Sequence, residues 1–372
     1  MMRLSRNCIA ASARPGRGAR AGALALAVAA GCAGPGAGPD PQGGPPTSVE
    51  RRLAAMGTTL AIELEGATRA QALEASEAAY LAIGAVEKRL STWTDESELA
   101  RVNAAPVGEL HGLSPELRAD LEACWHWWRE TGGAFDPSVG ALIELWDLRG
   151  AGRIPSGEEV RRAHIPRGLP EAFALEPGGV VRRVASAQLE EGGFGKGIGL
   201  DAALAELRAR AIPRATLDLG GQVAALDSEQ PLRWSIADPR ERSRAVLAWD
   251  FRGGSIATTG NSERARTVGG RRIGHVLDPR TGSPAEDFGS VSVWAKTAAD
   301  ADAFSTALFV MGPEAALAFA SARDDLDVVV LEVRAEGLSA RATPSLRGRL
   351  TPLDTHLHLQ FEPAPPSGSA AH

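Results

Sequence analysis

A carboxylate and a hydroxyl stand four positions apart in the segment 299–312, which reads ADADAFSTALFVMG. On a helix this spacing places the side chains of Asp302 and Thr306 on one face. Hard oxygen ligands near a helix start suit Mg²⁺, which takes about six oxygens and keeps waters or substrate phosphates among them. The alternative is structural, with a carboxylate that caps the helix and a Thr that bonds its own helix. The spacing by itself leaves both interpretations open.

A glycine-rich loop over 192–197, GGFGKG, precedes a second predicted helix. Its glycines expose backbone, and the N–H groups of the helix that follows can face an anion. Only three of the 40 lysine and arginine residues are lysines, and Lys196 lies in this loop. A compact ammonium is therefore indicated there. The spacing matches neither a dinucleotide-binding fingerprint nor a P-loop, and a structural turn is the alternative.

His275 ends an apolar stretch and is followed by the turn sequence Asp-Pro-Arg-Thr-Gly over 278–282. A histidine in this position can act as a general base, or it can be a structural hydrogen-bonding residue. Aromatic residues flank two further turns, Trp93 after Leu-Ser-Thr and Phe135 before Asp-Pro. An exposed aromatic ring beside a turn can stack on a planar ligand.

These residues need helices and strands to position them. Apolar spacing and capping residues predict helices over 70–90, 113–131, 196–210, 299–310 and 313–322. Short alternating or β-branched runs predict strands over 60–64, 215–219, 223–226, 234–237, 246–251, 255–258, 291–295 and 326–333. Residues 150–180 are predicted to form an insertion or loop with one short helix. Strands mixed with helices without strict alternation favour an α+β fold over a doubly wound sheet.

The composition excludes several classes of protein. A hydrophobic content of 44% over 372 residues excludes general disorder. No run of about 18–20 strongly apolar residues exists, which excludes a polytopic membrane protein. The net charge is −6, but residues 1–31 hold five arginines and no acid, so the remainder carries −11. A protein this acidic is not expected to bind nucleic acid through a broad basic surface.

The N-terminus is typical of an exported lipoprotein. Residues 1–31 combine an arginine-bearing start with the apolar stretch AGALALAVAAG over 21–31, which is typical of a signal peptide. Cys32 follows Ala-Ala-Gly in a sequence that resembles a bacterial lipobox, which predicts acylation of its thiol. Ordinary cleavage that leaves a free cysteine is the alternative. Residues 32–48 are rich in Gly and Pro and are predicted to be a flexible linker.

The folded body is expected over 49–362, followed by a disordered tail over 363–372. This body contains Cys124 and no other cysteine, so no disulfide is expected within it.

Eight sequence blocks together resemble the ApbE family, the FAD:protein FMN transferases, from Met56 to about Gly312. The resemblance implies a single flavin transferase domain with mixed, largely antiparallel sheets flanked by helices. The blocks, in order, are MGTT (56–59), LSTWTDESELARVN (90–103), GGAFDPSVGALIELW (132–146), GGFGKG (192–197), LDLGG (217–221), ATTGNSER (257–264), HVLDPRTGSP (275–284) and ADAFSTALFVMG (301–312).

The resemblance also implies a reaction. Members of the family use Mg²⁺ at the pyrophosphate of FAD, move FMN onto a Thr or Ser of a target protein and release AMP. By this resemblance Mg²⁺ is bound by Asp302 and Thr306, by the backbone carbonyl of Gly193 and by the backbone at Ser305. His275 is the implied base, with Asp302 and Lys196 as further catalytic residues. The flavin contacts fall on Met56, Trp93, Ala134, Phe135, Asp136, Glu190 and Lys196.

Three positions depart from the family pattern. Trp93 stands where Tyr is commoner, Glu190 where an aspartate is usual, and Ser262 where Tyr is frequent. Two alternatives to a transferase remain open at this point. One is an FAD pyrophosphatase that uses water as acceptor, and the other is a non-catalytic flavin-binding lipoprotein. The expected partners are FAD and an exported flavin-acceptor protein of an electron-transport system. The expected location is the extracytoplasmic side of a bacterial membrane, with a lipid anchor.

Overall fold

The computed structural model describes residues 47–66, 68–261 and 265–363. The predicted signal peptide over 1–31, Cys32 and Ser262 lie outside the described residues, as does most of the predicted tail. The first strand, β1, begins at Thr47, two residues before the expected start of the folded body. Within the described part of the chain, no helix is long and apolar enough to cross a membrane.

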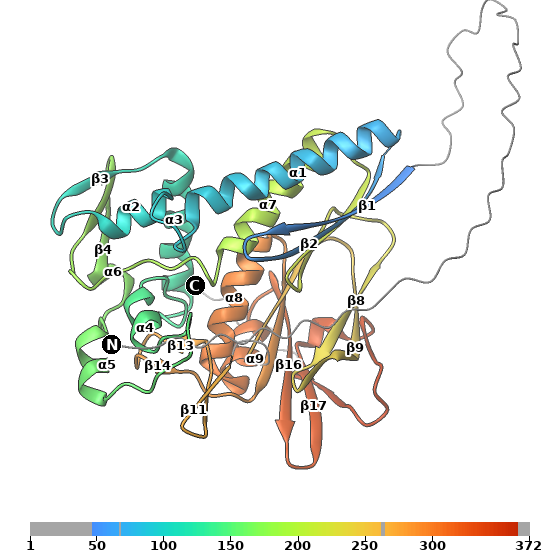
Figure 1. Cartoon of the computed structure of the whole chain (residues 1–372). Helices are drawn as coiled ribbons and strands as arrows, with labels where there is room; N and C mark the ends of the chain where they lie inside the picture. Colours follow the sequence, from blue (N-terminus) through green and yellow to red (C-terminus); the bar gives the residue numbers. More distant parts are fainter. Residues whose placement is uncertain (1–46, 67, 262–264, 364–372) are drawn as a thin grey trace, which may run out of the picture. The chain divides into compact units, whose positions relative to one another are not determined.

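A nine-stranded sheet lies at the centre of the described residues (Figure 1). Its order is β1-β2-β6-β7-β10-β15-β16-β17-β19, and each neighbouring pair is antiparallel except β17 and β19. The predicted α+β class with largely antiparallel sheets is therefore confirmed. The strands are β1 (Thr47–Ala55), β2 (Thr58–Gly66), β6 (Arg214–Leu219), β7 (Gln222–Ala225), β10 (Gly254–Gly260), β15 (Gly289–Ala295), β16 (Leu326–Arg334), β17 (Gly337–Ala342) and β19 (His358–Phe361).

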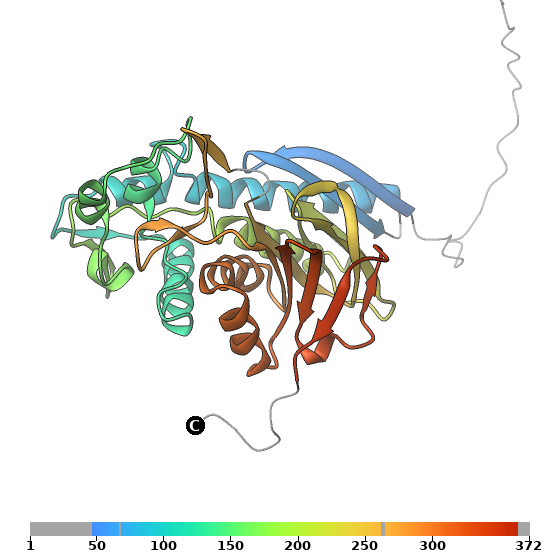
Figure 2. The same ribbon diagram turned by 90° about the horizontal axis from the view of Figure 1, so that it is seen from below.

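Helices cover one face of this sheet. Helices α1 (Arg69–Leu90) and α7 (Gly195–Ala209) pack on β1, β2 and β6. Helices α8 (Ala298–Met311) and α9 (Pro313–Ser321) pack on β15 and β16, and Figure 2 shows them beside the red strands. Side chains alternate between the two faces of a strand, so every second residue of β15, such as Val291 and Val293, is buried under these helices.

A smaller sheet covers the opposite face. Its order is β18-β9-β8, formed by β8 (Leu232–Asp238), β9 (Glu241–Phe251) and β18 (Leu350–Pro352). The indole of Trp249 is fully buried between this sheet and residues such as Val329 of the main sheet. The main sheet is thus buried on both faces over β7, β10 and β16, which makes its centre a rigid support.

The segment between α1 and α7 forms a separate group of short elements. These are α2 (Glu98–Ala104), β3 (Leu110–Gly112), α3 (Pro115–Glu130), α4 (Gly140–Leu145), α5 (Gly157–Ala163), α6 (Leu169–Ala172), β4 (Phe173–Glu176) and β5 (Gly179–Arg182). The prediction of one short helix over 150–180 was wrong, because α5, α6 and a β-hairpin lie there. Two hairpins follow β10, made by β11 (Arg266–Val268) with β12 (Arg271–Ile273) and by β13 (Leu277–Asp278) with β14 (Ser283–Pro284).

Candidate active site

The start of α7 is the centre of the site. No side chain of its own caps this helix start, and its N-cap residue is Phe194. Instead, Asp302 of α8 accepts a hydrogen bond from the backbone N–H of Gly197 at 3.1 Å. The ammonium of Lys196 lies 3.2 Å from Oδ1 of the same carboxylate. Asp302 is only 5% exposed, so its charge is held by a helix start and a lysine rather than by water.

The two helices cap each other. Asp201 of α7 accepts hydrogen bonds from the backbone N–H groups of Ala298 and Ala299 at 2.8 and 2.9 Å. Burial raises the pKa of Asp201, and these two bonds act against that rise. The helices approach so closely that a Cβ on Gly197 would lie 2.3 Å from the carbonyl oxygen of Ala298. The position of Asp302 is therefore fixed by the backbone of both helices.

Oxygen donors gather around Asp302. Thr306 donates to the carbonyl of Asp302 at 3.2 Å, and Ser305 donates to the same carbonyl at 3.0 Å. Gly193 of the loop lies against Thr306, because a Cβ on Gly193 would be 3.3 Å from Oγ1 of Thr306. The structure thus brings together the residues that the sequence resemblance assigned to a metal.

This donor set fits Mg²⁺. It offers one carboxylate, one hydroxyl and backbone carbonyls, all hard oxygen atoms. Among the described residues no group of three or more His, Cys, Asp and Glu side chains could hold an ion by itself. Such a site suits a cation that completes its shell with waters and phosphate oxygens.

His275 lies on the connection between β12 and β13 and is half-buried. Its backbone N–H donates to Oδ1 of Asn261 at 3.1 Å. The turn that follows is braced from outside, because the indole N–H of Trp146 donates to the carbonyl of Gly282 at 2.9 Å. Asp278 accepts hydrogen bonds from the backbone N–H and the guanidinium of Arg280, and these bonds stabilise the turn.

Phe135 and its neighbours face the protein interior. The Phe135 ring is 2% exposed and stacks edge-on against Trp127, with ring centroids 5.4 Å apart. Asp136 accepts hydrogen bonds from the N–H groups of Ser138 and Leu169 at 2.7 and 2.8 Å. Burial raises the pKa of Asp136, and these bonds counteract the rise. The Phe135 ring therefore belongs to the protein core in this structure.

Ala134 is likewise 1% exposed. Met56 lies at the turn between β1 and β2 with a positive φ of 48°. Its sulfur lies 3.2 Å from the position that a Cβ on Gly199 of α7 would take, so it packs on the start of that helix.

Trp93 has the exposure that a ring-stacking residue needs, at 68%. The guanidinium of Arg149 lies over its ring, 4.6 Å from the centroid. Arg149 also donates to the carbonyl of Thr92 at 3.0 Å and pairs with the carboxylate of Glu190. Arg149 thus connects Trp93 to the residues just before the glycine loop.

Two adjacent carboxylates precede that loop. The Thr92 hydroxyl lies 2.9 Å from Glu190 and 2.5 Å from Glu191. Burial and the neighbouring Glu191 raise the pKa of Glu190 to about 7, while Arg149 and Thr92 oppose the rise. Glu190 is therefore a carboxyl group that changes its protonation near neutral pH.

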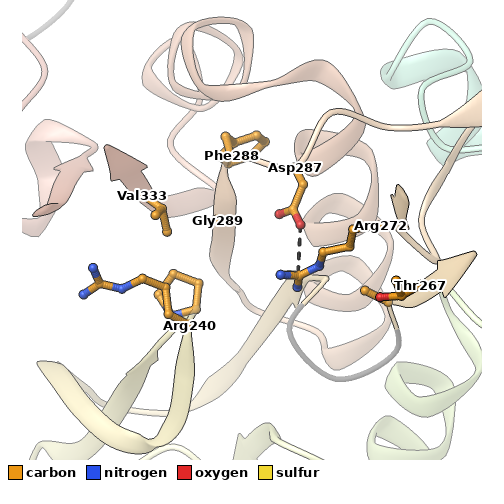
Figure 3. A pocket seen from close by; sticks show the side chains of 9 residues that line it. Arg240, Thr267, Arg272, Asp287, Phe288, Gly289 and Val333 are labelled. Carbon is orange, nitrogen blue, oxygen red and sulfur yellow. Dashed lines mark ion pairs between the residues drawn. The ribbon is translucent and has the colours of Figure 1, made fainter. Parts of the chain in front are cut away.

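A pocket of about 500 Å³ lies beside the β11–β12 hairpin (Figure 3). Strand β12 of this hairpin comes just before His275 in the chain. Arg272 points toward Asp287 in its wall, at 3.8 Å, whereas Arg240 extends away from that pair. None of the predicted site residues lines this pocket.

Several residues of the site were missed by the sequence reasoning. Arg149, Asp201 and Asn261 each contact a predicted site residue or its helix, yet none belongs to a spacing that suggests chemistry. For Asn261 a signal existed in the block ATTGNSER, which was recognised without any role assigned to it. Arg149 and Asp201 act through contacts between segments far apart in the chain, which no local pattern reveals.

Comparison with known proteins gives one consistent result. The ApbE family matches residues 56–330 of this chain. A protein of Rhodobacter capsulatus named FAD:protein FMN transferase is 33% identical over 82% of this chain, and the chain spans 59% of that protein. A protein of Treponema pallidum with the same name is 32% identical over 61% of this chain and 68% of its own length.

Solved structures agree with the sequence relatives. The ApbE protein of Thermotoga maritima superposes with a TM-score of 0.74 at 27% identity, over 82% of this chain and 99% of its own. The flavin transferase ApbE of Vibrio cholerae gives a TM-score of 0.72 at 26% identity, over 82% of this chain and all of its own. On the matched residues, the identity to relatives and the shared fold, this chain belongs to the ApbE family.

Proposed function

We propose that this chain transfers FMN from FAD to the hydroxyl of a Thr or Ser in an acceptor protein and releases AMP. The P–O–P bond of FAD breaks, and a phosphoester forms between the FMN phosphorus and the acceptor oxygen. The hydroxyl proton goes to a base. The observation that carries the proposal is the cluster of Lys196, Asp302, Thr306 and Gly193 at the start of α7, together with relatives that are named FAD:protein FMN transferase.

Phosphoryl transfer depends on positioning and on neutralised charge more than on covalent participation by the protein. Asp302, Thr306 and the backbone at Gly193 and Ser305 would hold Mg²⁺, which supplies positive charge to the pyrophosphate and to the leaving AMP. Lys196 adds a point charge at the same place, and the start of α7, which already binds the Asp302 carboxylate, favours negative charge. His275 takes the proton of the acceptor hydroxyl.

The flavin ring is proposed to stack on Trp93, which is the exposed aromatic residue of the site. Glu190, near its ionisation point, can accept a hydrogen bond from the ring or donate one to it. Trp93 thus keeps the aromatic ring of the commoner Tyr, and Glu190 keeps the carboxyl group of the commoner Asp.

The test is an incubation with FAD, Mg²⁺ and a flavin-acceptor domain. Asp302→Asn removes the negative charge but keeps an oxygen that can accept the N–H of Gly197, so the fold should survive. Wild-type protein is expected to give covalent flavin fluorescence on the acceptor that resists SDS, and Asp302→Asn to lose it by at least a hundredfold. Asp324→Asn, which removes an exposed carboxylate, is the matched control and should retain full transfer.

The same assay separates the alternatives. AMP and free FMN without labelled acceptor would indicate a pyrophosphatase. FAD binding without any AMP would indicate a flavin-binding protein. Full activity of Asp302→Asn would contradict the proposed site.

We also propose that the chain acts outside the cytoplasm, anchored to a membrane through an acylated Cys32. The support is the sequence of residues 1–48. An exported electron-transport protein is then the proposed acceptor.

A further inference from the structure

The end of β10 touches both halves of the proposed site. Residues two apart in a strand point to the same face, so Thr259 shares the side of Ala257, and Asn261 directly follows the strand. The side of Ala257 and Thr259 is the face on which α8 packs. Thr258, between Ala257 and Thr259, points to the other face and bonds Ser292 of β15 at 2.8 Å.

Thr259 reaches the helix that carries Asp302. Its hydroxyl lies 2.8 Å from the hydroxyl of Ser305. The single hydroxyl proton of Ser305 is donated to the backbone carbonyl of Asp302, at 3.0 Å. Thr259 is therefore the donor to Ser305. A chain of two hydrogen bonds thus runs from β10 to the backbone carbonyl of Asp302.

Asn261 reaches the connection that carries His275. Its side chain is fully buried, and Oδ1 accepts the His275 N–H at 3.1 Å. The Asn261 carbonyl also accepts a bond from the guanidinium of Arg272 at 3.2 Å. A Cβ on Gly274 would lie 2.6 Å from Nδ2 of Asn261, so the amide packs directly against the residue before His275.

Gly260, between the two, fixes this end of the strand to its neighbour. It pairs with Ser290, and a Cβ on it would lie 2.9 Å from the carbonyl oxygen of Gly289. Any larger residue would push β10 away from β15. The sequence Thr-Gly-Asn thus joins α8, β15 and the His275 connection within three residues.

We propose that Thr259 and Asn261 are positioning residues that hold the metal-binding turn of α8 and the base His275 at a fixed separation. The proposal rests on the function proposed above. It assigns a role to the block ATTGNSER (257–264), for which the sequence indicated none. Thr259 acts on Asp302 through Ser305, and Asn261 acts on His275 through its backbone N–H.

The first experiment compares Thr259→Val with Thr258→Val. Each variant removes one hydroxyl from the same strand and breaks one hydrogen bond of 2.8 Å, but only Thr259 faces α8. Binding of Mg²⁺ alone is measured by calorimetry on the whole chain. We expect Thr259→Val to raise the Mg²⁺ concentration at half-saturation about five- to tenfold, the effect of one hydrogen bond, and Thr258→Val to leave it unchanged. Equal Mg²⁺ binding by both variants would overturn the role of Thr259.

The second experiment compares Asn261→Ala with Asn261→Asp. The Asp variant keeps an oxygen for the His275 N–H, and the Ala variant does not. Amide hydrogen exchange of the peptide that contains His275 is expected to accelerate at least tenfold in Asn261→Ala and to stay closer to wild type in Asn261→Asp. In the transfer assay Asn261→Ala should lower kcat about tenfold or more with an unchanged dissociation constant for FAD, and Asn261→Asp should recover part of the loss.

These outcomes keep the two proposals distinguishable. Faster exchange at His275 with an unchanged kcat would overturn the positioning role of Asn261 while leaving the transferase function intact. A wild-type protein that transfers no FMN would contradict the proposed function, whereas the exchange and Mg²⁺ measurements would still report on both contacts. Should Asn261→Ala fail to fold, Asn261→Ser provides a smaller hydroxyl oxygen for the same measurements.

Discussion

The residues around Glu190 show how a small change of side chain alters a site. Glu190 is 12% exposed at its side chain, and its carboxylate and that of Glu191 share the single hydroxyl of Thr92. Two like charges this close disfavour full ionisation. Arg149 offsets part of the cost and at the same time covers one face of Trp93.

Glu190 should make the protein less stable as pH rises. In the unfolded chain a glutamate ionises near pH 4.5, whereas the pKa of Glu190 in the folded protein is raised to about 7. Between these values the folded state holds the extra proton, so the free energy of unfolding falls as pH increases through this window. Glu190→Gln removes the effect and should gain about 1–3 kcal/mol relative to wild type between pH 5 and pH 8.

Urea unfolding at four pH values across this range measures the difference. Glu122→Gln, which removes a carboxylate that is 56% exposed on α3, is the control and should follow the wild-type curve. A Glu190→Gln curve parallel to wild type would show that Glu190 ionises normally.

At the scale of elements, the site depends on the crossing of α7 and α8. Asp302 accepts an N–H at the start of α7, and Asp201 accepts two N–H groups at the start of α8. A carboxylate at a helix start is stabilised by the local dipole, so each helix holds the acidic residue of the other. This reciprocal capping needs a short distance between the two backbones, and Gly197 allows it.

Gly197→Ala should separate these helices. The added Cβ would lie 2.3 Å from the carbonyl of Ala298 and 2.6 Å from Cα of Ala299, both of them backbone atoms. We expect a loss of about 1–3 kcal/mol in the free energy of unfolding and a large loss of FMN transfer, since Asp302 moves with α8.

The matched control is Gly84→Ala in α1, where a Cβ meets nothing within 4 Å. This variant should be more stable than wild type by about 0.5–1 kcal/mol, because glycine is a poor helix former. Thermal unfolding and the transfer assay compare the two. A Gly197→Ala protein as stable and active as Gly84→Ala would show that the helices need no such close approach.

At the scale of the whole molecule, the main sheet assembles the site from distant parts of the chain. Strand β10 lies in the middle of the sheet and is covered on both faces, by α8 and by the smaller sheet. A strand packed in this way cannot shift without disturbing two cores. It is therefore a stable base from which Thr259 and Asn261 extend.

The proposed anchor belongs to this scale as well. Cys32→Ser removes the thiol that acylation requires. In a bacterial host we expect the variant to leave the membrane fraction, while the purified protein keeps its FMN transfer activity, because residue 32 precedes the folded body predicted over 49–362. Cell fractionation with immunoblotting measures the distribution. Retention of Cys32→Ser in the membrane fraction, as for wild type, would contradict the lipid anchor.

Much of the fold could be predicted from local patterns. The helix expected over 70–90 is α1 (Arg69–Leu90), and the helix over 299–310 is α8 (Ala298–Met311). Long periodic segments with capping residues carry this information in their own sequence. The strands β17 and β19 were not predicted, because their pairing with β16 and with each other supplies stability that the short segments lack.

The site shows the same division. Asp302 and Thr306 could be placed on one face because helix geometry alone relates them. Lys196 could be singled out by its rarity among 40 basic residues, but its partner could not, since 106 positions separate it from Asp302. The ring of Phe135 is buried against Trp127, a core contact that its position beside a predicted turn does not reveal.

The sequence by itself determined the chemical groups of this protein, the helices and strands that carry them, and its resemblance to the ApbE family. The tertiary structure decided which groups meet. It set the Asp302 carboxylate against Lys196, bound His275 to Asn261, and raised the pKa of Glu190 by burying it beside Glu191. The reason is physical: hydrogen bonds, burial and charge depend on distances in space, and those between remote segments exist only once the sheet and its helices have packed.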